Sequence, residues 1–282
     1  MIIHGLFFCR IDSIQIIILI SPFIVTMKVI SYNVNGIRSA LSKGFITFLQ
    51  EENPDIVCLQ EIKANEADID QSLFEALGYH CFWFSAQKKG YSGVGILSKL
   101  KPVSVIKGIQ HELFDYEGRV LTLNFDNFSV MSCYFPSGTT GDIRQEIKYQ
   151  FLDHFYNYIN TLEQHKEALI VCGDYNICHR EIDIHDPIGN KNSSGFLPEE
   201  RAWMDKWFGN GMIDTFRHLN QGPDQYTWWS FRTAARSRNK GWRIDYISLS
   251  QTLESQLITS GILSQHVHSD HCGSFATLNI TI

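Results

Sequence analysis

Apolar positions along this chain follow two alternating patterns. Residues 28–34, 55–61 and 168–176 contain unbroken apolar runs that end in polar residues, which is typical of strands buried on both faces. Residues 44–53 and 66–78 instead carry apolar residues at helical spacing, and a proline and a glycine mark their ends. This alternation of strands and helices predicts an α/β fold.

The middle of the chain is predicted to contain consecutive short strands separated by turns. They cover residues 79–86, 93–99, 102–108, 119–125 and 128–135. Strands that follow one another without a helix between them favour antiparallel pairing within the α/β frame.

The second half of the chain resumes the alternation. Residues 142–164 form the longest predicted helix, with Asp142 as its N-cap, and residues 197–211 predict another that begins at Pro198. The expected buried stripe of the first comprises Ile143, Ile147, Phe151, Phe155, Ile159 and Leu162. Further strands are expected at 225–232, 242–250 and 274–282. Together these elements predict a four-layer α/β sandwich, in which two packed mixed β-sheets are flanked by helices.

The first 26 residues differ from the rest. They are very apolar, yet the longest uncharged run, Ser13 to Thr26, is too short for a membrane span of about 20 residues. They also lack the small-residue cleavage site of a signal peptide. We expect 1–26 to lie outside the working domain and 27–282 to form one catalytic domain; a weak membrane anchor is the alternative.

Composition limits the possible partners. The net charge of −6 provides no overall attraction to nucleic acid, so any such contact needs a local basic surface. The segment 232–243 offers one, because it contains no acidic residue. Its basic residues are Arg232, Arg236, Arg238, Lys240 and Arg243. Seven cysteines without a C-x-x-C pair indicate free thiols in a reducing compartment, and we expect a cytoplasmic location.

Polar residues recur where predicted strands end. They are Asn33, Asn35, Glu61, Tyr134, Asp174, Asn176, Asp245, Asp270 and His271. Singly, each has an ordinary interpretation as a turn residue, a cap, a core aromatic or, for Asp245, a partner of Arg243. Together they indicate metal-assisted hydrolysis, because carboxylate and amide oxygens suit Mg²⁺ or Mn²⁺ and a histidine beside an aspartate suggests an oriented imidazole.

These motifs also resemble a known family. In order along the chain, "SYNVNGIR", "CLQEIK", "YFPSG", "VCGDYN", "GNKNSSGF", "TWWSFR", "GWRIDY" and "SDHCG" are similar to the exonuclease III family of apurinic/apyrimidinic (AP) endonucleases, within the endonuclease/exonuclease/phosphatase superfamily. The resemblance covers residues 27–282. It implies a DNA-repair phosphodiesterase that cleaves 5′ to abasic sites in double-stranded DNA and leaves a 3′-hydroxyl, with possible 3′→5′ exonuclease or 3′-repair activity. We expect a monomer without a stable membrane partner.

The resemblance also implies roles for individual residues. Glu61, Asn33, Asn35 and Asp270 would hold the Mg²⁺ or Mn²⁺ ion. The catalytic set would be Asp174 for the attacking water, Asn176 and His271 for phosphoryl charge, Asp245 for orienting His271, and Tyr134 for the phosphate or leaving oxygen. Substrate contacts would come from Trp228 and Trp242 around a flipped-out abasic sugar, from Asn190, and from Arg232, Arg236, Arg238 and Lys240.

Alternatives remain open on the sequence alone. Another phosphodiesterase or phosphatase of the superfamily, acting on inositol phosphates, lipids or RNA, would share the core residues. The basic segment and the tryptophan pair argue against it, because a small polar headgroup needs neither. An inactive DNA-binding protein would need a broken core, and a membrane-tethered hydrolase would use residues 1–26. Thr139 and Thr140 stand where some family members carry a basic residue.

Overall fold

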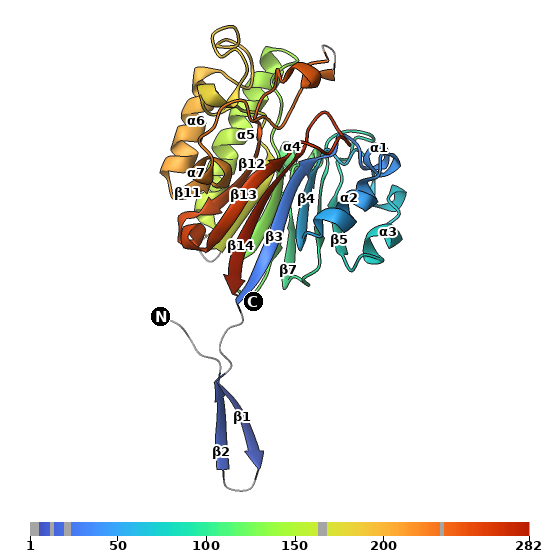
Figure 1. The fold of residues 1–282 in the computed structure, drawn as a ribbon, viewed down its shortest axis with the longest axis vertical. Helices are drawn as coiled ribbons and strands as arrows, with labels where there is room; N and C mark the ends of the chain where they lie inside the picture. Colours follow the sequence, from blue (N-terminus) through green and yellow to red (C-terminus); the bar gives the residue numbers. More distant parts are fainter. Residues whose placement is uncertain (1–5, 12–13, 20–23, 163–167, 232–233, 282) are drawn as a thin grey trace.

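Two six-stranded sheets pack face to face and carry helices on their outer faces (Figure 1). The computed structural model describes residues 6–11, 14–19, 24–162, 168–231 and 234–281. The observed layers confirm the predicted α/β sandwich.

Sheet I has the strand order β13-β14-β3-β4-β6-β5. Its strands are β3 (Ile24–Asn33), β4 (Ile56–Gln60), β5 (His80–Phe84), β6 (Val94–Ser98), β13 (Leu257–Leu263) and β14 (Gly273–Thr281). Only β3 and β4 pair in parallel, and the other neighbours are antiparallel, as expected for strands that follow one another.

Sheet II has the order β11-β12-β10-β9-β8-β7. Its strands are β7 (Ser104–Lys107), β8 (Val120–Asn124), β9 (Ser129–Tyr134), β10 (Leu169–Asp174), β11 (Met212–Asp214) and β12 (Asp245–Ser250). Here β9 and β10 form the parallel pair.

Helices cover the two outer faces. Those on the sheet I side are α1 (Ile37–Ser42), α2 (Phe45–Glu52) and α3 (Ser72–Glu75). The others are α4 (Glu112–Tyr116), α5 (Asp142–Thr161), α6 (Pro198–Gly209) and α7 (Thr215–Leu219). Short 3₁₀ turns include η1 (Glu66–Asp68), η3 (Glu181–Asp183), η5 (Arg236–Arg238) and η6 (Gln251–Gln256).

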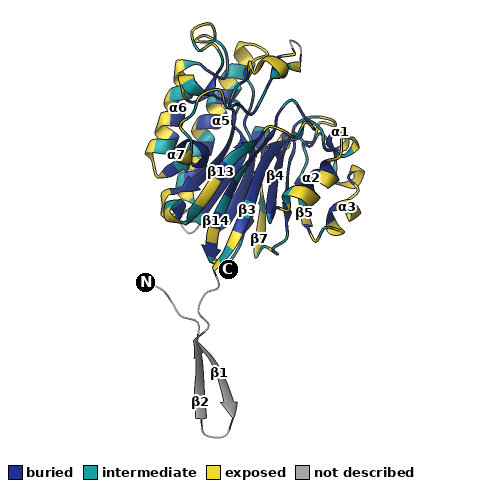
Figure 2. Ribbon diagram, in the orientation of Figure 1, coloured by how far each residue is buried: buried dark blue, intermediate teal, exposed yellow. Residues whose placement is uncertain are grey.

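Central strands are buried on both faces, as Figure 2 shows. On β3, Val29 contributes to the core between the sheets, whereas its neighbour Ile30 packs with α1, α2 and α3. On β10, Ile170 faces the inter-sheet core and Val171 packs with residues of α5 and α6. This two-sided burial explains why these strands are apolar without alternation.

Several expected elements differ from those observed. The helix predicted over 66–78 is reduced to η1 and α3, because the Asp70 side chain accepts hydrogen bonds from the backbone and hydroxyl of Ser72 and forms a turn there. The strand predicted over 225–232 is wrong, since Trp228 makes only isolated bridges to Trp242 and His271. The strands and helices that no prediction covered are β1 (Leu6–Ile11), β2 (Ile14–Leu19), β11, β13, α1, α4 and α7.

The start of α5 also departs from expectation. Gly141 is the N-cap and Asp142 lies in the first turn, so the predicted Asp142 cap is wrong. Ile143 is 80% exposed, although it was expected on the buried stripe. In its place α5 buries Lys148, a charged residue on the same helical face as Phe151 and Phe155.

The N-terminal segment supplies strands to two different sheets. β1 (Leu6–Ile11) and β2 (Ile14–Leu19) pair with each other in a separate two-stranded sheet. β3 begins at Ile24, before the expected boundary at Met27, and residues 24–26 pair with β14. Among the described residues, no helix is both long enough and apolar enough to cross a bilayer.

Candidate active site

The sheet topology brings the polar strand ends together. The parallel pairs β3/β4 and β9/β10 place four carboxyl ends at one edge of the sandwich. β12 runs antiparallel to β10 and begins at the same edge, where Asp245 lies opposite Asp174. The site therefore takes its rigid groups from both sheets.

Asn33 joins the two sheets at this edge. Its side-chain amide donates hydrogen bonds to Glu61 Oε1 and to Asp174 Oδ2, both at 2.8 Å. The Asn33 side chain is fully buried, so it holds the two carboxylates in a fixed relation.

Asp174 is a buried carboxylate with a shifted pKa. Burial, followed by repulsion from Asp245, raises the pKa of Asp174 to about 7. Its Oδ1 accepts a 2.8 Å hydrogen bond from the Asn176 backbone. A carboxylate with such a pKa can accept a proton near neutral pH.

His271 lies between two aspartates. Its Nδ1 donates to Asp245 Oδ2 at 2.9 Å, and its Nε2 lies 3.9 Å from Asp174 Oδ2. Burial alone would lower the pKa of His271, but the carboxylates of Asp245 and Asp174 outweigh burial and raise it to about 10. The imidazole is therefore cationic at neutral pH and is fixed in orientation by Asp245.

Left-handed backbone conformations also occur at this edge. Asn35, Glu61 and Asn176 have positive φ angles of 45°, 51° and 52°. A left-handed backbone is unfavourable for a residue such as glutamate and persists where surrounding contacts impose it.

Asp270 and Asn35 are bound to each other. Asn35 Nδ2 donates to Asp270 Oδ1 at 2.8 Å, and Trp228 Nε1 donates to Asp270 Oδ2 at 3.0 Å. Lys63 contacts Asn35 Oδ1 and forms an ion pair with Glu61 Oε2 at 2.7 Å. The oxygens of Asp270 and Asn35 thus already have partners within the protein.

Tyr134 lies at the end of β9, with its phenol toward the acids. Burial, followed by the charges of Glu61 and Asp174, raises its pKa well above the usual range, so the phenol stays protonated. Arg119 donates to the Tyr134 carbonyl at 2.9 Å and stacks on its ring, with 4.9 Å between the guanidinium carbon and the ring centroid.

A pocket of about 790 Å³ opens beside these groups. Trp228 and Trp242 form one wall, with ring planes at 89° and centroids 6.1 Å apart. Glu61, Tyr134, Asp174, Asn176, Asp270 and His271 also line it. The pocket therefore combines an apolar wall with the charged edge.

The other expected substrate residues are spread more widely. Asn190 does not line the pocket; its amide binds the carbonyls of His185 and Asp186 at 3.1 and 2.9 Å. Arg236 binds the carbonyls of Ser264 and His266 at 2.8 and 3.0 Å. These contacts hold Arg236 within the fold.

The remaining candidates belong to the loop that joins the two pocket tryptophans. Arg238 and Lys240 are exposed on this loop. Arg232 lies outside the described residues. The loop leaves the pocket at Trp228 and returns to it at Trp242.

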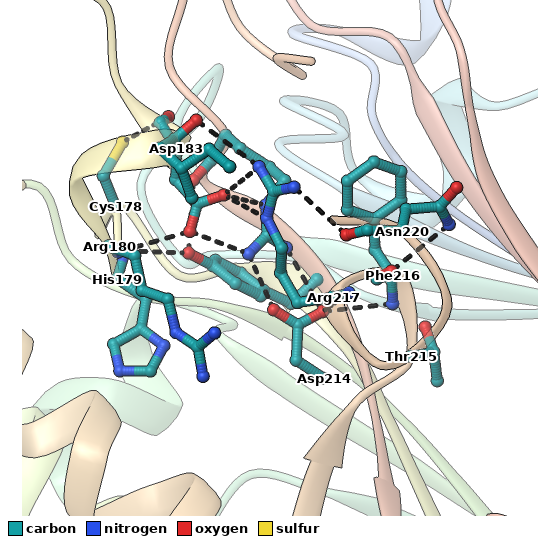
Figure 3. A network of polar contacts seen from close by, with 12 residues as sticks. Cys178, His179, Arg180, Asp183, Asp214, Thr215, Phe216, Arg217 and Asn220 are labelled. Carbon is teal, nitrogen blue, oxygen red and sulfur yellow. Dashed lines mark hydrogen bonds and ion pairs between the residues drawn. The ribbon is translucent and has the colours of Figure 1, made fainter. Parts of the chain in front are cut away.

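Arg243 is not part of that exposed surface. It is buried and binds Asp183 at 2.7 Å and Asp214 at 2.6 Å, while Arg217 also binds Asp183 at 2.7 Å (Figure 3). This network joins η3, β11, α7 and the start of β12. The interpretation of Asp245 as a partner of Arg243 is wrong, since Asp245 binds His271.

Comparison with known proteins agrees with this site. Residues 30–271 match the endonuclease/exonuclease/phosphatase family. The chain belongs to this family. It is 42% identical over 258 residues to the exodeoxyribonuclease of Bacillus subtilis (strain 168), which covers 90% of this chain and 100% of the relative. It is 40% identical over 250 residues to the DNA-(apurinic or apyrimidinic site) endonuclease of Dictyostelium discoideum, which covers 87% of this chain and 69% of the relative.

Solved structures of the same fold include two nucleases. An AP endonuclease from Archaeoglobus fulgidus superposes with a TM-score of 0.83 at 28% identity, over 90% of this chain and 100% of the other. A 3′-5′ exonuclease from Neisseria meningitidis gives 0.84 at 26% identity, with the same coverage of 90% and 100%. As a member of the endonuclease/exonuclease/phosphatase family, this chain is a hydrolase that acts on phosphodiester bonds.

The family depends on divalent metal, and the donor groups here fit such an ion. Ligand atoms of Glu61, Asp174 and His271 lie within 4.8 Å of one another. Two of the three are carboxylates, the hard oxygen donors that such cations prefer. Of the expected ligands, Glu61 belongs to this cluster. Asp270 Oδ1 accepts a hydrogen bond from Asn35, and Asn33 presents its amide nitrogen to Glu61.

Sequence reasoning missed several residues around this family's active site. Lys63, Arg119 and Lys148 all contact site residues. Only Lys148 left a signal, because it lies three and seven positions before Phe151 and Phe155 and therefore shares their helical face. Lys63 and Arg119 lie on no such pattern.

Proposed function

We propose that this protein is an AP endonuclease that uses Mg²⁺ or Mn²⁺ and hydrolyses the phosphodiester 5′ to an abasic site in double-stranded DNA, leaving a 3′-hydroxyl. The proposal assigns this activity to residues 27–282, acting as a monomer in the cytoplasm. The observation that carries it is the meeting of Asp174, Glu61 and the Asp245–His271 pair beside a pocket walled by two tryptophans.

Asp174 is the proton acceptor in this proposal. Its pKa is raised to about 7, whereas that of His271 is raised to about 10. At neutral pH His271 is charged and cannot accept a proton, so it stabilises negative charge on the phosphoryl oxygens instead. Asp174 takes the proton of the attacking water, and the amide of Asn33 keeps its carboxylate in place.

Other residues act on substrate and leaving group. Tyr134 donates from its protonated phenol to the phosphate or the leaving oxygen. Asn176 contributes to phosphoryl charge stabilisation, and Asn190 contacts the flanking backbone. Glu61, with Asn33, Asn35 and Asp270 nearby, would hold the divalent cation, which would supply stabilisation of charge at the scissile phosphate.

Substrate selection follows from the pocket and the adjoining loop. Trp228 and Trp242 receive the flipped-out abasic sugar, which is smaller than an intact nucleoside. Arg232, Arg236, Arg238 and Lys240 are assigned to the DNA backbone, with Arg238 and Lys240 the exposed members.

The proposal is tested with a DNA duplex containing one abasic site, beside the same duplex undamaged. We expect Mg²⁺-dependent incision of the abasic duplex alone, a product that a polymerase can extend from its 3′-hydroxyl, and loss of incision in EDTA. Full activity in excess EDTA would contradict the metal assignment. Turnover of an inositol phosphate or RNA with the abasic duplex left intact would favour another branch of the family.

Asp174→Asn should reduce incision by about 10²–10⁴-fold, because it removes the proton acceptor. DNA binding, measured by fluorescence anisotropy in EDTA, should stay within about threefold of wild type. Asp126→Asn is the control, since Asp126 is exposed in the β8–β9 turn at the opposite end of the sheet. Near wild-type turnover by Asp174→Asn would refute the assigned role.

A second activity, 3′→5′ exonuclease or 3′-end repair, is included in the proposal. The similarity to a protein named exodeoxyribonuclease and to a 3′-5′ exonuclease structure supports it. A duplex with a recessed 3′ end, assayed under the same conditions, measures this activity directly.

A further inference from the structure

Lys148 is a lysine whose side chain has no exposure to solvent. It lies in α5, which packs beside α6 on the outer face of sheet II (Figure 1). A buried ammonium group is unfavourable unless the fold supplies charged and hydrogen-bonding partners. The partners of Lys148 therefore indicate what the residue does.

Lys148 connects a charged partner to the active site. Its ammonium group donates to Glu200 Oε1 at 2.5 Å and to the Asn176 carbonyl at 2.8 Å. Glu200 is equally buried, and it belongs to the first turn of α6. No other described donor is recorded for the Asn176 carbonyl, so Lys148 alone satisfies it.

Glu200 extends the connection to the pocket wall. Its Oε2 accepts hydrogen bonds from the backbones of Gly195 at 2.6 Å and Leu197 at 3.0 Å. Both residues line the pocket. The Lys148–Glu200 ion pair thus holds two segments of main chain. One is Asn176, just after β10, and the other is residues 195–197 in the pocket wall.

The two segments fit closely against each other. A Cβ on Gly195 would come within 3.0 Å of both the Asn176 carbonyl oxygen and the Trp242 ring, and Gly195 has a φ of +95°. The Asn176 backbone is also left-handed, with a φ of 52°. Small displacements here would move the Asn176 amide that hydrogen-bonds Asp174 Oδ1 at 2.8 Å.

We propose that the buried Lys148–Glu200 pair is a positioning element that sets the place of Asn176 against Asp174 and of the Gly195 wall against Trp242. The inference rests on the proposed function of Asp174 and Asn176 and assigns them a support in α5 and α6. A buried ion pair seldom adds net stability over an apolar pair of the same size. Its directional bonds to two separate segments account for its presence here.

The test compares Lys148→Met with a matched lysine elsewhere. Lys148→Met keeps the side-chain volume and removes the ammonium group, while Glu200 retains three N–H donors from Gly195, Leu197 and Gln145. Lys28→Met is the control: Lys28 also binds one glutamate and one carbonyl, both of Glu52, and lies in the first half of β3, five residues before Asn33.

We expect Lys148→Met to lower kcat for the abasic duplex by about 10- to 100-fold, with KM within about threefold of wild type, because misplacement of catalytic groups slows chemistry more than binding. Lys28→Met should leave kcat unchanged. In ¹⁵N NMR spectra of the metal-free protein, the amide signals of Asn176 and Gly195 should shift in Lys148→Met only. A folded Lys148→Met with wild-type kcat and unshifted signals would overturn the proposal.

A second variant covers the case in which Lys148→Met does not fold. Glu200→Gln has the same shape, but one of its two oxygens becomes an NH₂ group that cannot accept a hydrogen bond. Either Lys148 and Gln145 or the backbones of Gly195 and Leu197 then lose their acceptor, so kcat should fall at least fivefold. Wild-type kcat and unshifted Asn176 and Gly195 signals in Glu200→Gln would also overturn the inference. Failure of the wild-type enzyme to cut abasic DNA would count against the proposed function alone, since the NMR shifts test the positioning separately.

Discussion

At the scale of single residues, the site depends on two buried groups whose pKa values are both raised, that of Asp174 to about 7 and that of His271 to about 10, for different reasons. Asp174 and His271 are 1% and 4% exposed, so neither is screened by water. Burial favours the neutral form of each, but only His271 has a carboxylate bonded directly to its ring. Asp174 therefore titrates near neutral pH while His271 stays charged, which divides proton acceptance from charge stabilisation.

Asp245→Asn should lower the pKa of His271, because burial then acts without the carboxylate that opposes it. NMR titration of the His271 ring signals in the metal-free protein measures this shift. The raised pKa stabilises the folded state below about pH 6.5, the unfolded value, and this contribution disappears as pH rises through about 10. We also expect Asp245→Asn to lower kcat for the abasic duplex by about 10²–10³-fold. An unchanged His271 titration in the variant would show that Asp245 does not set it.

At the scale of elements, four short pieces of chain are held by one ion network. Asp183, Asp214, Arg217 and Arg243 are all buried, and they join η3, β11, α7 and the start of β12 (Figure 3). β12 begins with Asp245, two residues after Arg243, so the network also supports the residue that orients His271. Loss of one member would leave an uncompensated charge in the interior.

Asp183→Asn should lower the free energy of unfolding by about 3–5 kcal/mol, measured by urea denaturation at pH 7. Burial would raise the pKa of Asp183, but Arg243 and Arg217 outweigh it and lower the pKa to about 2. The resulting stability is present above the unfolded pKa of about 3.9 and is lost as pH falls through about 2.

The control for this network is Asp205→Asn. The Asp205 side chain is 76% exposed and pairs with His179, so its loss should cost less than about 1 kcal/mol. An equal loss of unfolding free energy in Asp183→Asn and Asp205→Asn would refute the prediction that the buried Asp183 network stabilises the fold more than an exposed ion pair does.

At the scale of the whole molecule, DNA binding must overcome a net charge of −6. The loop from Trp228 to Trp242 starts and ends at the pocket and exposes Arg238 and Lys240. The proposed DNA contact lies on this loop, where a local basic segment offsets the overall negative charge.

Lys240→Ala should weaken binding to abasic and undamaged duplexes by a similar factor, since a phosphate contact carries no sequence information. The slope of log K against log salt should decrease by about one. Lys101→Ala is the control, because Lys101 is exposed before β7, at the opposite end of sheet II. If Lys240→Ala and Lys101→Ala changed the slope of log K against log salt equally, this would contradict a DNA contact at the loop between Trp228 and Trp242.

Local pattern was enough to predict much of this protein. The two-sided apolar runs identified β3, β4 and β10, and the polar residues after them identified Glu61 and Asp174 as candidates. These signals are readable because burial of a strand, and the turn that ends it, depend on neighbouring residues in the chain.

Only the tertiary structure decided which polar groups meet. Lys63 pairs with Glu61, Arg243 with Asp183, and Lys148 with Glu200, and none of these pairs follows from spacing. Lys148 occupies a buried helical position normally taken by an apolar residue, while Ile143 is exposed. The sequence by itself determined the strands and the chemistry at their ends, because periodic burial is a local property. The fold decided the ion pairs and the pocket, because a buried charge is tolerated only where distant segments bring its partner to it.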